Sequence, residues 1–489
     1  MPPWLINRVI PVLALLLYGI TAWISKGYYH YDEHYQIIEF AFFKMGLSDV
    51  KTLAWEYQAG IRSGIQPFIA FLICRSCYVL NIKDPYILAF VLRLLSVLLI
   101  LPCKYFFYKV SVKSVPAGNG HQLFFLLATF FIWFFPYLSV RFSAENWSAM
   151  CLLMTVSLLM AGYSKEKDKQ RRLIYASAFF LGLAFTIRFQ SAFCVLGVIG
   201  WMLFVKREKG REMLIYISIL IIPLLLEVLT DRWLYNKFVF AAYQYFLVNI
   251  VHDRASEFGT MTVLSYLWML FSDMGWGVAV FAMLGLAILC IDYKNILLWI
   301  IVPFIIGHLI VPHKETRFMF PLMHFIPYLL LTVIVFLEKQ KGFFATKGAV
   351  SLMVVFGIYN LVALTCLTRK LPGASDKDLT YYIHRKCRSE EVYLIFENNC
   401  HPYDPIWELG VKENFYAEKN IRYYTLDLVL DYLNIDVFKN KRIVLVATPD
   451  KLKDYNTTQL IKQLGLHKTM EIQPVLYSDK MLLYDNLKP

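Results

Sequence analysis

Long apolar runs separated by short polar loops fill the first three quarters of the chain. Each run has roughly 17 to 25 residues, which is long enough for a helix to cross about 30 Å of hydrocarbon. The pattern therefore predicts an all-α polytopic membrane protein with about eleven spanning helices. We expect these spans near residues 5–24, 86–108, 122–140, 146–163, 173–188, 191–205, 213–230, 268–291, 296–312, 319–337 and 348–367.

A further apolar run, residues 65–80, is interrupted by Arg75, and the basic loops decide how it lies in the membrane. The loops richest in lysine and arginine are Lys165–Arg172, Lys206–Arg211 and Lys339–Lys341. All of them fall on one side, as the positive-inside rule requires, only if residues 65–80 do not cross the membrane fully. This topology leaves outside the cytoplasm the first loop, residues 231–262, residues 313–318 and the tail.

The pattern changes after residue 370, where short β-type runs replace the long apolar ones. These runs are EVYLIF at 391–396, IRYYTL at 421–426 and IVLVA at 443–447. Helical or turn segments such as residues 456–465 follow them, and this alternation is typical of a small α/β domain. We predict two domains, the membrane domain at 1–369 and an extracytoplasmic α/β domain at 370–489.

Composition agrees with this class, because 58% of the residues are hydrophobic and the mean hydropathy is +0.51. The net charge of +13 lies in the inter-helix loops, so it reports topology and gives no reason to expect a nucleic-acid partner. The nine cysteines show no metal-ligand spacing. We predict that no metal or other cofactor is essential, with a divalent metal as an open alternative.

The first predicted loop gathers many acids beside the membrane. Asp32 and Glu33 form a carboxylate pair that can act as a general base, bind a metal or bond sugar hydroxyls, and Arg62 is a candidate neighbour. The alternative is a solvated start of the loop. His30 and His34 flank the pair with a spacing more typical of surface hydrogen bonding than of metal ligation. Candidates for contact with the acceptor or the sugar are Trp55, Glu56 and Tyr57.

A second polar cluster lies between two predicted spans, in the sequence VPHKETRFMFP at residues 311–321. Its charged or titratable members are His313, Lys314, Glu315 and Arg317. Basic residues on the non-cytoplasmic face are not explained by topology, and they suit the phosphate of a lipid headgroup. Arg188, at the outer turn between two spans, either lines this site or extends to the lipid headgroups.

These clusters, in this order, resemble glycosyltransferase family 22. The family's first loop carries an HPDE-type motif followed by TWEW-x-x-GIRS, and its late loop carries HKEERF. The matching segments here are His30–Glu33, Leu53–Tyr57, Gly60–Ser63 and His313–Phe318, with Thr186–Phe189 and Asp231–Phe240 resembling two further family segments. The chain departs from the family at Tyr31, Phe189, Asn236 and Thr316, which stand where the family has proline, proline, glycine and glutamate.

The resemblance implies a GT-C type fold and a hexosyltransferase that moves a hexose, expected to be mannose, from a polyprenyl-phosphate-sugar to a glycan or glycolipid hydroxyl with inversion. It assigns Asp32 as general base with Glu33 in support. The donor phosphate would be bound by His313, Lys314, Glu315 and Arg317, together with Arg62 and Arg188. The expected partners are the donor lipid, the acceptor and membrane lipids. The expected location is the bacterial plasma membrane or the ER membrane, with the active site on the non-cytoplasmic face.

Two alternatives belong to other functional classes. A lipid or solute transporter, or a flippase, would explain the spans, but it predicts charged residues at mid-membrane depth and broken helices in symmetric halves. The predicted loops instead place the charges at helix ends on one face. A different GT-C transferase, acting on lipid or protein, is the second alternative, and the HKETRF sequence favours family 22 over it.

Overall fold

The computed structural model describes residues 8–114, 119–164, 167–341, 347–369, 377–387, 391–403, 411–433, 435–472 and 480–487. The chain forms two compact units. The first, here called the helical unit, comprises Met1–Ser25, Glu56–Ile69 and Val91–Lys370. The second, here called the sheet unit, comprises Lys26–Trp55, Ala70–Phe90 and Leu371–Pro489. The predicted boundary at residue 370 lies outside the described residues, so the division into domains 1–369 and 370–489 stays a prediction.

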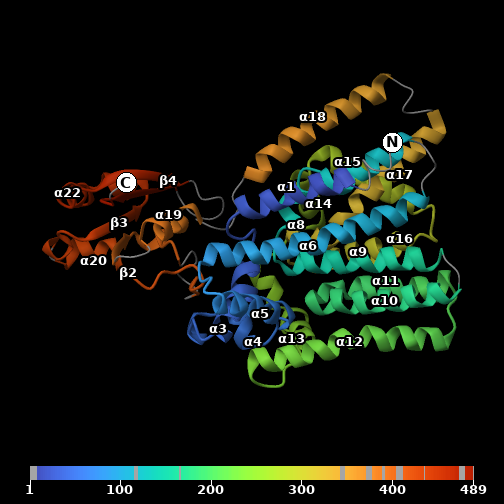
Figure 1. Cartoon of the computed structure of the whole chain (residues 1–489), viewed down its shortest axis with the longest axis horizontal. Helices are drawn as coiled ribbons and strands as arrows, with labels where there is room; N and C mark the ends of the chain where they lie inside the picture. Colours follow the sequence, from blue (N-terminus) through green and yellow to red (C-terminus); the bar gives the residue numbers. More distant parts are fainter. Residues whose placement is uncertain are drawn as a thin grey trace. The chain divides into compact units, whose positions relative to one another are not determined.

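Apart from the short helices of the first loop and several 3-10 and π-helical turns, the described regular structure before residue 369 consists of α-helices, most of them apolar (Figure 1). They are α1 (Ile10–Ile24), α4 (Trp55–Ala59), α5 (Ile65–Val79), α6 (Pro85–Ser111), α7 (Asn119–Phe131), α8 (Phe135–Ser139), α9 (Ala144–Gly162), α10 (Lys167–Ile187), α11 (Ala192–Gly200), α12 (Gly210–Tyr235), α13 (Ala241–Phe246), α14 (Val263–Met274), α15 (Trp276–Leu289), α16 (Ile296–Ile310), α17 (Ile326–Lys341) and α18 (Lys347–Arg369). Among the described residues, 5 helices are long and apolar enough to cross a membrane, or 6 if α14 and α15, bent by 117°, form one span. The predicted count of eleven is therefore not confirmed.

Within the helical unit, α10 packs against both α9 and α12 (Figure 1). One close approach requires a glycine. A Cβ atom at Gly182 of α10 would lie 2.2 Å from the carbonyl oxygen of Leu220 on α12. Since no side chain fits there, the small residue is what lets the two backbones approach, as is common between membrane helices.

Two cations lie inside α6, away from its ends. Arg93 donates from Nε to the carbonyl oxygen of Ala22 at 2.7 Å. Lys104 donates from Nζ to the hydroxyl of Tyr18 at 2.9 Å and to the carbonyl oxygen of Thr129 at 3.1 Å. The expectation that the charges lie only at helix ends is therefore wrong, because neighbouring helices supply acceptors that make interior cations tolerable.

A side chain of α18 satisfies the backbone where α7 ends and α8 begins. Asn360 donates from Nδ2 to the carbonyl oxygen of Phe131 at 2.7 Å. It also accepts a hydrogen bond at Oδ1 from the backbone N–H of Trp133 at 2.9 Å. Irregular backbone at membrane depth is stable only where such partners exist. The amide of Asn360 thus takes the place of the helical hydrogen bonds that this break removes.

Besides the parts of α5 and α6 within Ala70–Phe90, the sheet unit contains the short helices of the first loop and a mixed sheet. Its described elements are α2 (Tyr31–Glu33), η2 (His34–Ile38), α3 (Glu39–Lys44), η3 (Val50–Thr52), α19 (Lys377–Cys387), β1 (Val392–Phe396), η11 (Asn398–Cys400), β2 (Ile421–Thr425), α20 (Leu426–Asp431), η13 (Ile435–Phe438), β3 (Arg442–Ala447), α21 (Pro449–Lys453), α22 (Tyr455–Gln463), β4 (His467–Ile472) and β5 (Met481–Asp485). The strand order is β2-β1-β3-β5-β4, with β1 parallel to β2 and β3 and with β5 antiparallel to β3 and β4. The α/β prediction for the tail is confirmed, and β4 and β5 are additions to it.

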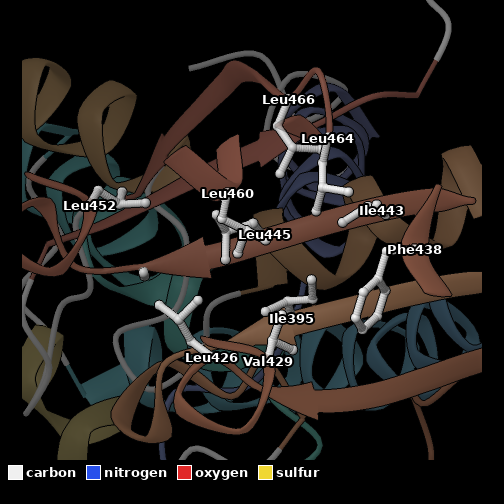
Figure 2. Packing of buried hydrophobic residues seen from close by; sticks show 11 residues of the cluster. Ile395, Leu426, Val429, Phe438, Ile443, Leu445, Leu452, Leu460, Leu464 and Leu466 are labelled. Atoms are coloured by element: carbon white, nitrogen blue, oxygen red, sulfur yellow. The ribbon is translucent and has the colours of Figure 1, made fainter. Parts of the chain in front are cut away.

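A dense hydrophobic core holds the helices of the tail against its sheet (Figure 2). Ile395, Ile443 and Leu445 come from the strands, and Leu426 and Leu460 come from α20 and α22. Four of the five residues of β1 are buried, so this interior strand is covered on both faces. This explains why its sequence is almost continuously apolar, as in buried parallel strands generally.

We predict that Asn360→Leu lowers the free energy of unfolding by about 1–3 kcal/mol, because it leaves a partly buried N–H and a partly buried carbonyl without this partner. Thermal unfolding of the full-length protein in detergent measures this change. Thr365→Val is the matched control, since the hydroxyl of Thr365 bonds only to the Leu361 carbonyl one turn away in the same helix. Equal stability of Asn360→Leu and wild type would contradict the assigned role.

Candidate functional site

Two buried arginines of the helical unit share one carboxylate. Arg188, which follows α10, donates from Nη1 to Glu145 Oε1 at 2.7 Å. Arg317 donates from Nη1 to the same oxygen at 3.3 Å. Both guanidinium groups lie 5.4 Å from the ring centre of Phe318. Residues far apart in the sequence therefore form one compact cationic group, here called the arginine pair.

Glu315 fastens the arginine pair to the loop before α17. Its carboxylate accepts hydrogen bonds from Nε and Nη2 of Arg317 and lies 2.9 Å from Nε2 of His313. His313 also contacts the carbonyl oxygen of Gly259 through Nδ1 at 2.9 Å. The backbone carbonyl of Glu315 accepts from the hydroxyl of Tyr266 at 3.2 Å. The predicted donor-binding residues His313, Glu315 and Arg317 thus form a single hydrogen-bonded network.

Lys314 lies in the same loop but points its ammonium at backbone. Its Nζ donates to the carbonyl oxygens of Val311 and Pro312, and the side chain is buried. The neighbouring Thr316 donates from its hydroxyl to the carboxylate of Asp273 on α14. Lys314 therefore braces the loop in this structure, and its assignment to phosphate binding stays a prediction.

Glu56, Tyr57 and Arg62 form a second group around the end of α12. Arg62 Nη2 lies 3.7 Å from Glu56 Oε1. The backbone of Arg62 exchanges two hydrogen bonds with the hydroxyl of Tyr235, at 3.2 Å and 2.7 Å. The hydroxyl of Tyr57 donates to the carbonyl oxygen of Leu234 at 3.0 Å. The predicted sugar-contacting and phosphate-contacting residues of this loop are therefore held by α12.

A tyrosine of α13 connects the two groups of the helical unit. The guanidinium of Arg62 lies 5.9 Å from the centre of the Tyr245 ring, within cation–π range. The same ring lies 5.3 Å from the ring of Phe189, the residue after Arg188. Arg62 and Arg188 are thus linked through packed aromatic rings.

The predicted acid pair belongs to the sheet unit, as does Trp55, the first residue of α4. His30 caps α2, because its Nδ1 accepts from the backbone N–H of Asp32 at 3.3 Å. The carboxylate of Asp32 is partly exposed and lies 3.5 Å from the same imidazole nitrogen. Glu33 is buried and accepts at Oε2 from the backbone N–H of Tyr29 at 2.9 Å. The two acids therefore differ, since Asp32 faces outward and Glu33 closes the loop.

Sequence reasoning singled out the segments 141–146 and 231–249 but assigned no site role to Glu145 or Tyr245. Glu145 lies in the first turn of α9, whose N-cap is Ser143, so its sequence context is that of an ordinary helix start. Tyr245 is one of many aromatic residues in its loop. The signal that could have found Glu145 is physical, because two arginines buried beside a membrane require a carboxylate partner.

Two solved structures share the fold of this chain. A crystal structure of ArnT from Cupriavidus metallidurans bound to undecaprenyl phosphate is similar to this chain with a TM-score of 0.52 and 13% sequence identity. The similarity covers 98% of each chain. A crystal structure of the same protein in the apo state gives a TM-score of 0.50. At this level of identity the likeness concerns the fold alone.

The family follows from the sequence comparison. Residues 10–390 match the model of the Alg9-like mannosyltransferase family, and the chain belongs to this family. Among its relatives is GPI mannosyltransferase 3 of Yarrowia lipolytica, 24% identical over 62% of this chain and 58% of that protein. Mannosyltransferase APTG1 of Arabidopsis thaliana is 26% identical over 65% of this chain and 56% of that protein. The match spans little more than half the length of these relatives. The resemblance to glycosyltransferase family 22 is confirmed.

We predict that His313 makes the stability of the protein depend on pH. Its hydrogen bond to Glu315 raises the pKa of His313 above the ordinary value of 6.5. The stability contributed by the protonated form is complete below pH 6.5 and is lost as the pH rises through the raised pKa. His313→Gln should therefore flatten the fall in melting temperature as the pH rises above 6.5.

The control for this measurement is His252→Gln, which changes an exposed histidine of the same unit. Melting temperatures of wild type and both variants are recorded in one detergent across the pH series. An unchanged slope in His313→Gln would contradict the prediction.

Proposed function

We propose that this protein is a membrane mannosyltransferase. It transfers mannose from a polyprenyl-phosphate-mannose donor to a hydroxyl of a glycan or glycolipid acceptor, with inversion at the anomeric carbon. Membership of the Alg9-like mannosyltransferase family supports the sugar, as do the GPI mannosyltransferase relatives. The shared fold with ArnT, which was crystallised with undecaprenyl phosphate, supports a polyprenyl-phosphate donor.

The observation that carries the proposal is an edge of the Arg188 guanidinium, here called the open edge, whose nitrogens lack hydrogen-bond partners among the described residues. Its Nη1 is bonded to Glu145, whereas its buried Nε and Nη2 have no hydrogen-bond partner among the described residues. These two nitrogens form the side-on fork of the guanidinium, which matches two oxygens of a phosphate. Because both atoms are buried, a phosphate reaches them only when the side chains above them move. Arg317 and His313 are close enough to the same network to stabilise charge that develops on the leaving phosphate.

Asp32 is the proposed general base. The acceptor oxygen attacks the anomeric carbon from the face opposite the phosphate, and the bond between that carbon and the phosphate oxygen breaks. The bonding electrons leave with the phosphate, and the acceptor proton passes to the carboxylate of Asp32. A partly exposed carboxylate suits this role better than Glu33, which is buried and bonded to the backbone of Tyr29.

Two observations bear on the alternatives, a transporter or flippase and a metal-dependent enzyme. Cations inside α6 remove one argument against a transporter or flippase, so the family membership carries the preference for an enzyme. Among the described residues no group of three or more His, Cys, Asp or Glu side chains could hold a metal ion. Independence from metals and cofactors stays a prediction, as do the host membrane and the face on which the site lies.

We predict that Asp32→Asn lowers the transfer rate by ~10²–10⁴-fold, the usual contribution of a positioned general base. The measurement is transfer of radiolabelled mannose from synthetic polyprenyl-phosphate-mannose to lipid and glycan acceptors in membranes. Asp436→Asn is the matched control, because Asp436 is an exposed aspartate that pairs with Lys439 on the surface. Full activity in Asp32→Asn would contradict the assignment of Asp32 as general base. Transfer only from another polyprenyl-phosphate-sugar would contradict mannose as the donor sugar.

We predict that Arg188→Lys weakens donor binding although it keeps the charge. Lysine cannot present the two parallel donors of the guanidinium, and hydrogen bonds to charged groups contribute about 1.5–3 kcal/mol each. The KM for the donor should therefore rise by about tenfold or more. Arg254→Lys, an exposed arginine paired with Glu257, is the control. An unchanged donor KM in Arg188→Lys would show that the phosphate binds elsewhere.

A further inference from the structure

The sheet unit contains a buried polar cluster that the proposed mechanism does not use. It consists of His34 and Glu39 from the first loop and Lys377 and Glu413 from the C-terminal domain. We propose that this cluster is a clamp through which the C-terminal domain positions the helix that carries Asp32. The inference rests on the proposed function for the role of Asp32, and it assigns positioning residues and a task for the C-terminal domain.

The first part of the clamp joins His34 to two carboxyl groups. His34 Nε2 lies 3.0 Å from Glu39 Oε1 and 3.7 Å from Glu413 Oε1. All three side chains are almost completely buried. Burying so many polar groups is unfavourable unless they bond to one another, and such networks restrict the geometry that the surrounding backbone can adopt. The cluster therefore selects one arrangement of first loop and tail.

Aromatic rings enclose the charged part of the clamp. Lys377 pairs with Glu413, and its Nζ lies 4.6 Å from the Tyr416 ring centre and 5.6 Å from that of Tyr28. The imidazole of His34 is stacked between the same two tyrosine rings, at 4.9 Å from Tyr28 and 5.4 Å from Tyr416. The rings exclude water, so the ion pair is stronger than a surface pair.

Three further hydrogen bonds join residues 412–415 of the tail to the first loop. The N–H of Phe415 donates to Glu39 Oε1 at 2.9 Å, and the side chain of Asn414 donates to the Thr52 hydroxyl at 3.0 Å. The N–H of Lys412 donates to the carbonyl oxygen of Thr52 at 3.2 Å. The segment 412–415 therefore bonds to the first loop at two separate places, residue 39 and residue 52.

Helical continuity connects the clamp to Asp32. The elements α2, η2 and α3 follow one another without a gap from Tyr31 to Lys44, and His34 begins the π-helical turn directly after α2. Asp32 precedes His34 by two residues on this helix. Fixing His34 and Glu39 thus fixes the direction in which Asp32 projects. A displacement of about 1 Å of a catalytic group can reduce the rate by about 10²-fold.

Burial favours the neutral forms of Glu39 and His34, the two groups that the first loop contributes to the clamp. Burial raises the pKa of Glu39 to about 8, against the hydrogen bonds from Phe415 and Asn414 that lower it. Burial lowers the pKa of His34 to about 3, against the charge of Glu413, which raises it. At neutral pH both Glu39 and His34 are therefore mostly neutral. Glutamine has the shape of a neutral glutamic acid, which makes Glu39→Gln a conservative change.

The test compares variants of the full-length protein in detergent by two measurements. The first is hydrogen–deuterium exchange of residues 28–44, which does not depend on activity. The second is the kcat and donor KM of mannose transfer near pH 6.5. For Glu39→Leu we expect faster exchange, a fall in kcat of roughly 10- to 100-fold and an unchanged donor KM. Glu39→Gln should restore both measurements to near wild type, because its carbonyl oxygen can accept the bond from Phe415.

A second variant keeps the test decisive if Glu39→Leu does not fold. The double variant Lys377→Met with Glu413→Leu replaces the buried ion pair by apolar side chains, a change that proteins often tolerate. It should speed the exchange of residues 28–44 and lower kcat in the same way. Glu391→Leu is the matched control in the tail, because Glu391 forms an exposed pair with Arg422.

Each result decides the proposal. Unchanged exchange in Glu39→Leu or the double variant would overturn it, and so would faster exchange with wild-type kcat. Equal losses in Glu39→Gln and Glu39→Leu would also overturn the assigned role of the Glu39 oxygen. Absence of mannose transfer by the wild type would overturn the proposed function instead, and the exchange measurement would still decide whether the clamp holds the loop.

Discussion

The constraint on which the structure depends is that a polar or charged group removed from water needs a partner inside the protein. Glu145 is the partner of two buried arginines, and Asn360 is the partner of backbone groups between α7 and α8. Tyr18 and the backbone of Thr129 are the partners of Lys104. In each case the partner comes from a distant part of the chain, because a nearby residue of a straight helix points elsewhere. These bonds therefore decide which helices are neighbours, beyond what apolar packing alone specifies.

The same constraint shapes the candidate site. The carboxylates of Glu145 and Glu315 balance the guanidinium groups of Arg188 and Arg317, so the network is not simply a cationic patch. Attraction of a phosphate must then come from the direction of individual donors, above all the open edge of Arg188. Donors fixed before the reaction stabilise developing charge without reorganisation, which is the usual source of electrostatic catalysis. A buried ion network of this kind is poor evidence for stability, so its presence agrees better with function.

Patterns of local origin could be read from the sequence, whereas partners across the fold could not. The apolar runs revealed the membrane class, and β1, β2 and β3 were found from their own residues. The strand β4, with the sequence HKTMEI, was missed because its residues are largely exposed and alternate too weakly. The cations His313 and Arg317 were found from their motif, yet Glu145 has the sequence context of an ordinary helix cap. The number of spans was least predictable, because several apolar helices are too short to cross the membrane alone.

Two departures from the family motifs, Asn236 and Tyr31, stand where the residue present suits the local backbone. Asn236 stands where the family has glycine, and it adopts φ of 55° at the end of α12, a conformation that asparagine tolerates better than most residues. Tyr31 stands where the family has proline, at the first position of α2, a place that suits proline because its N–H would lack a helical partner. Here the imidazole of His30 supplies the cap.

The other two departures change contacts in the helical unit. Thr316 replaces a glutamate and binds Asp273, which keeps a carboxylate beside the loop but moves it to α14. Phe189 replaces a proline and packs on Tyr245, the ring that also contacts Arg62. Thr316 and Phe189 therefore change the side chains that surround the cations. Such changes in the walls of a site are where differences in acceptor between members of one family are expected to arise.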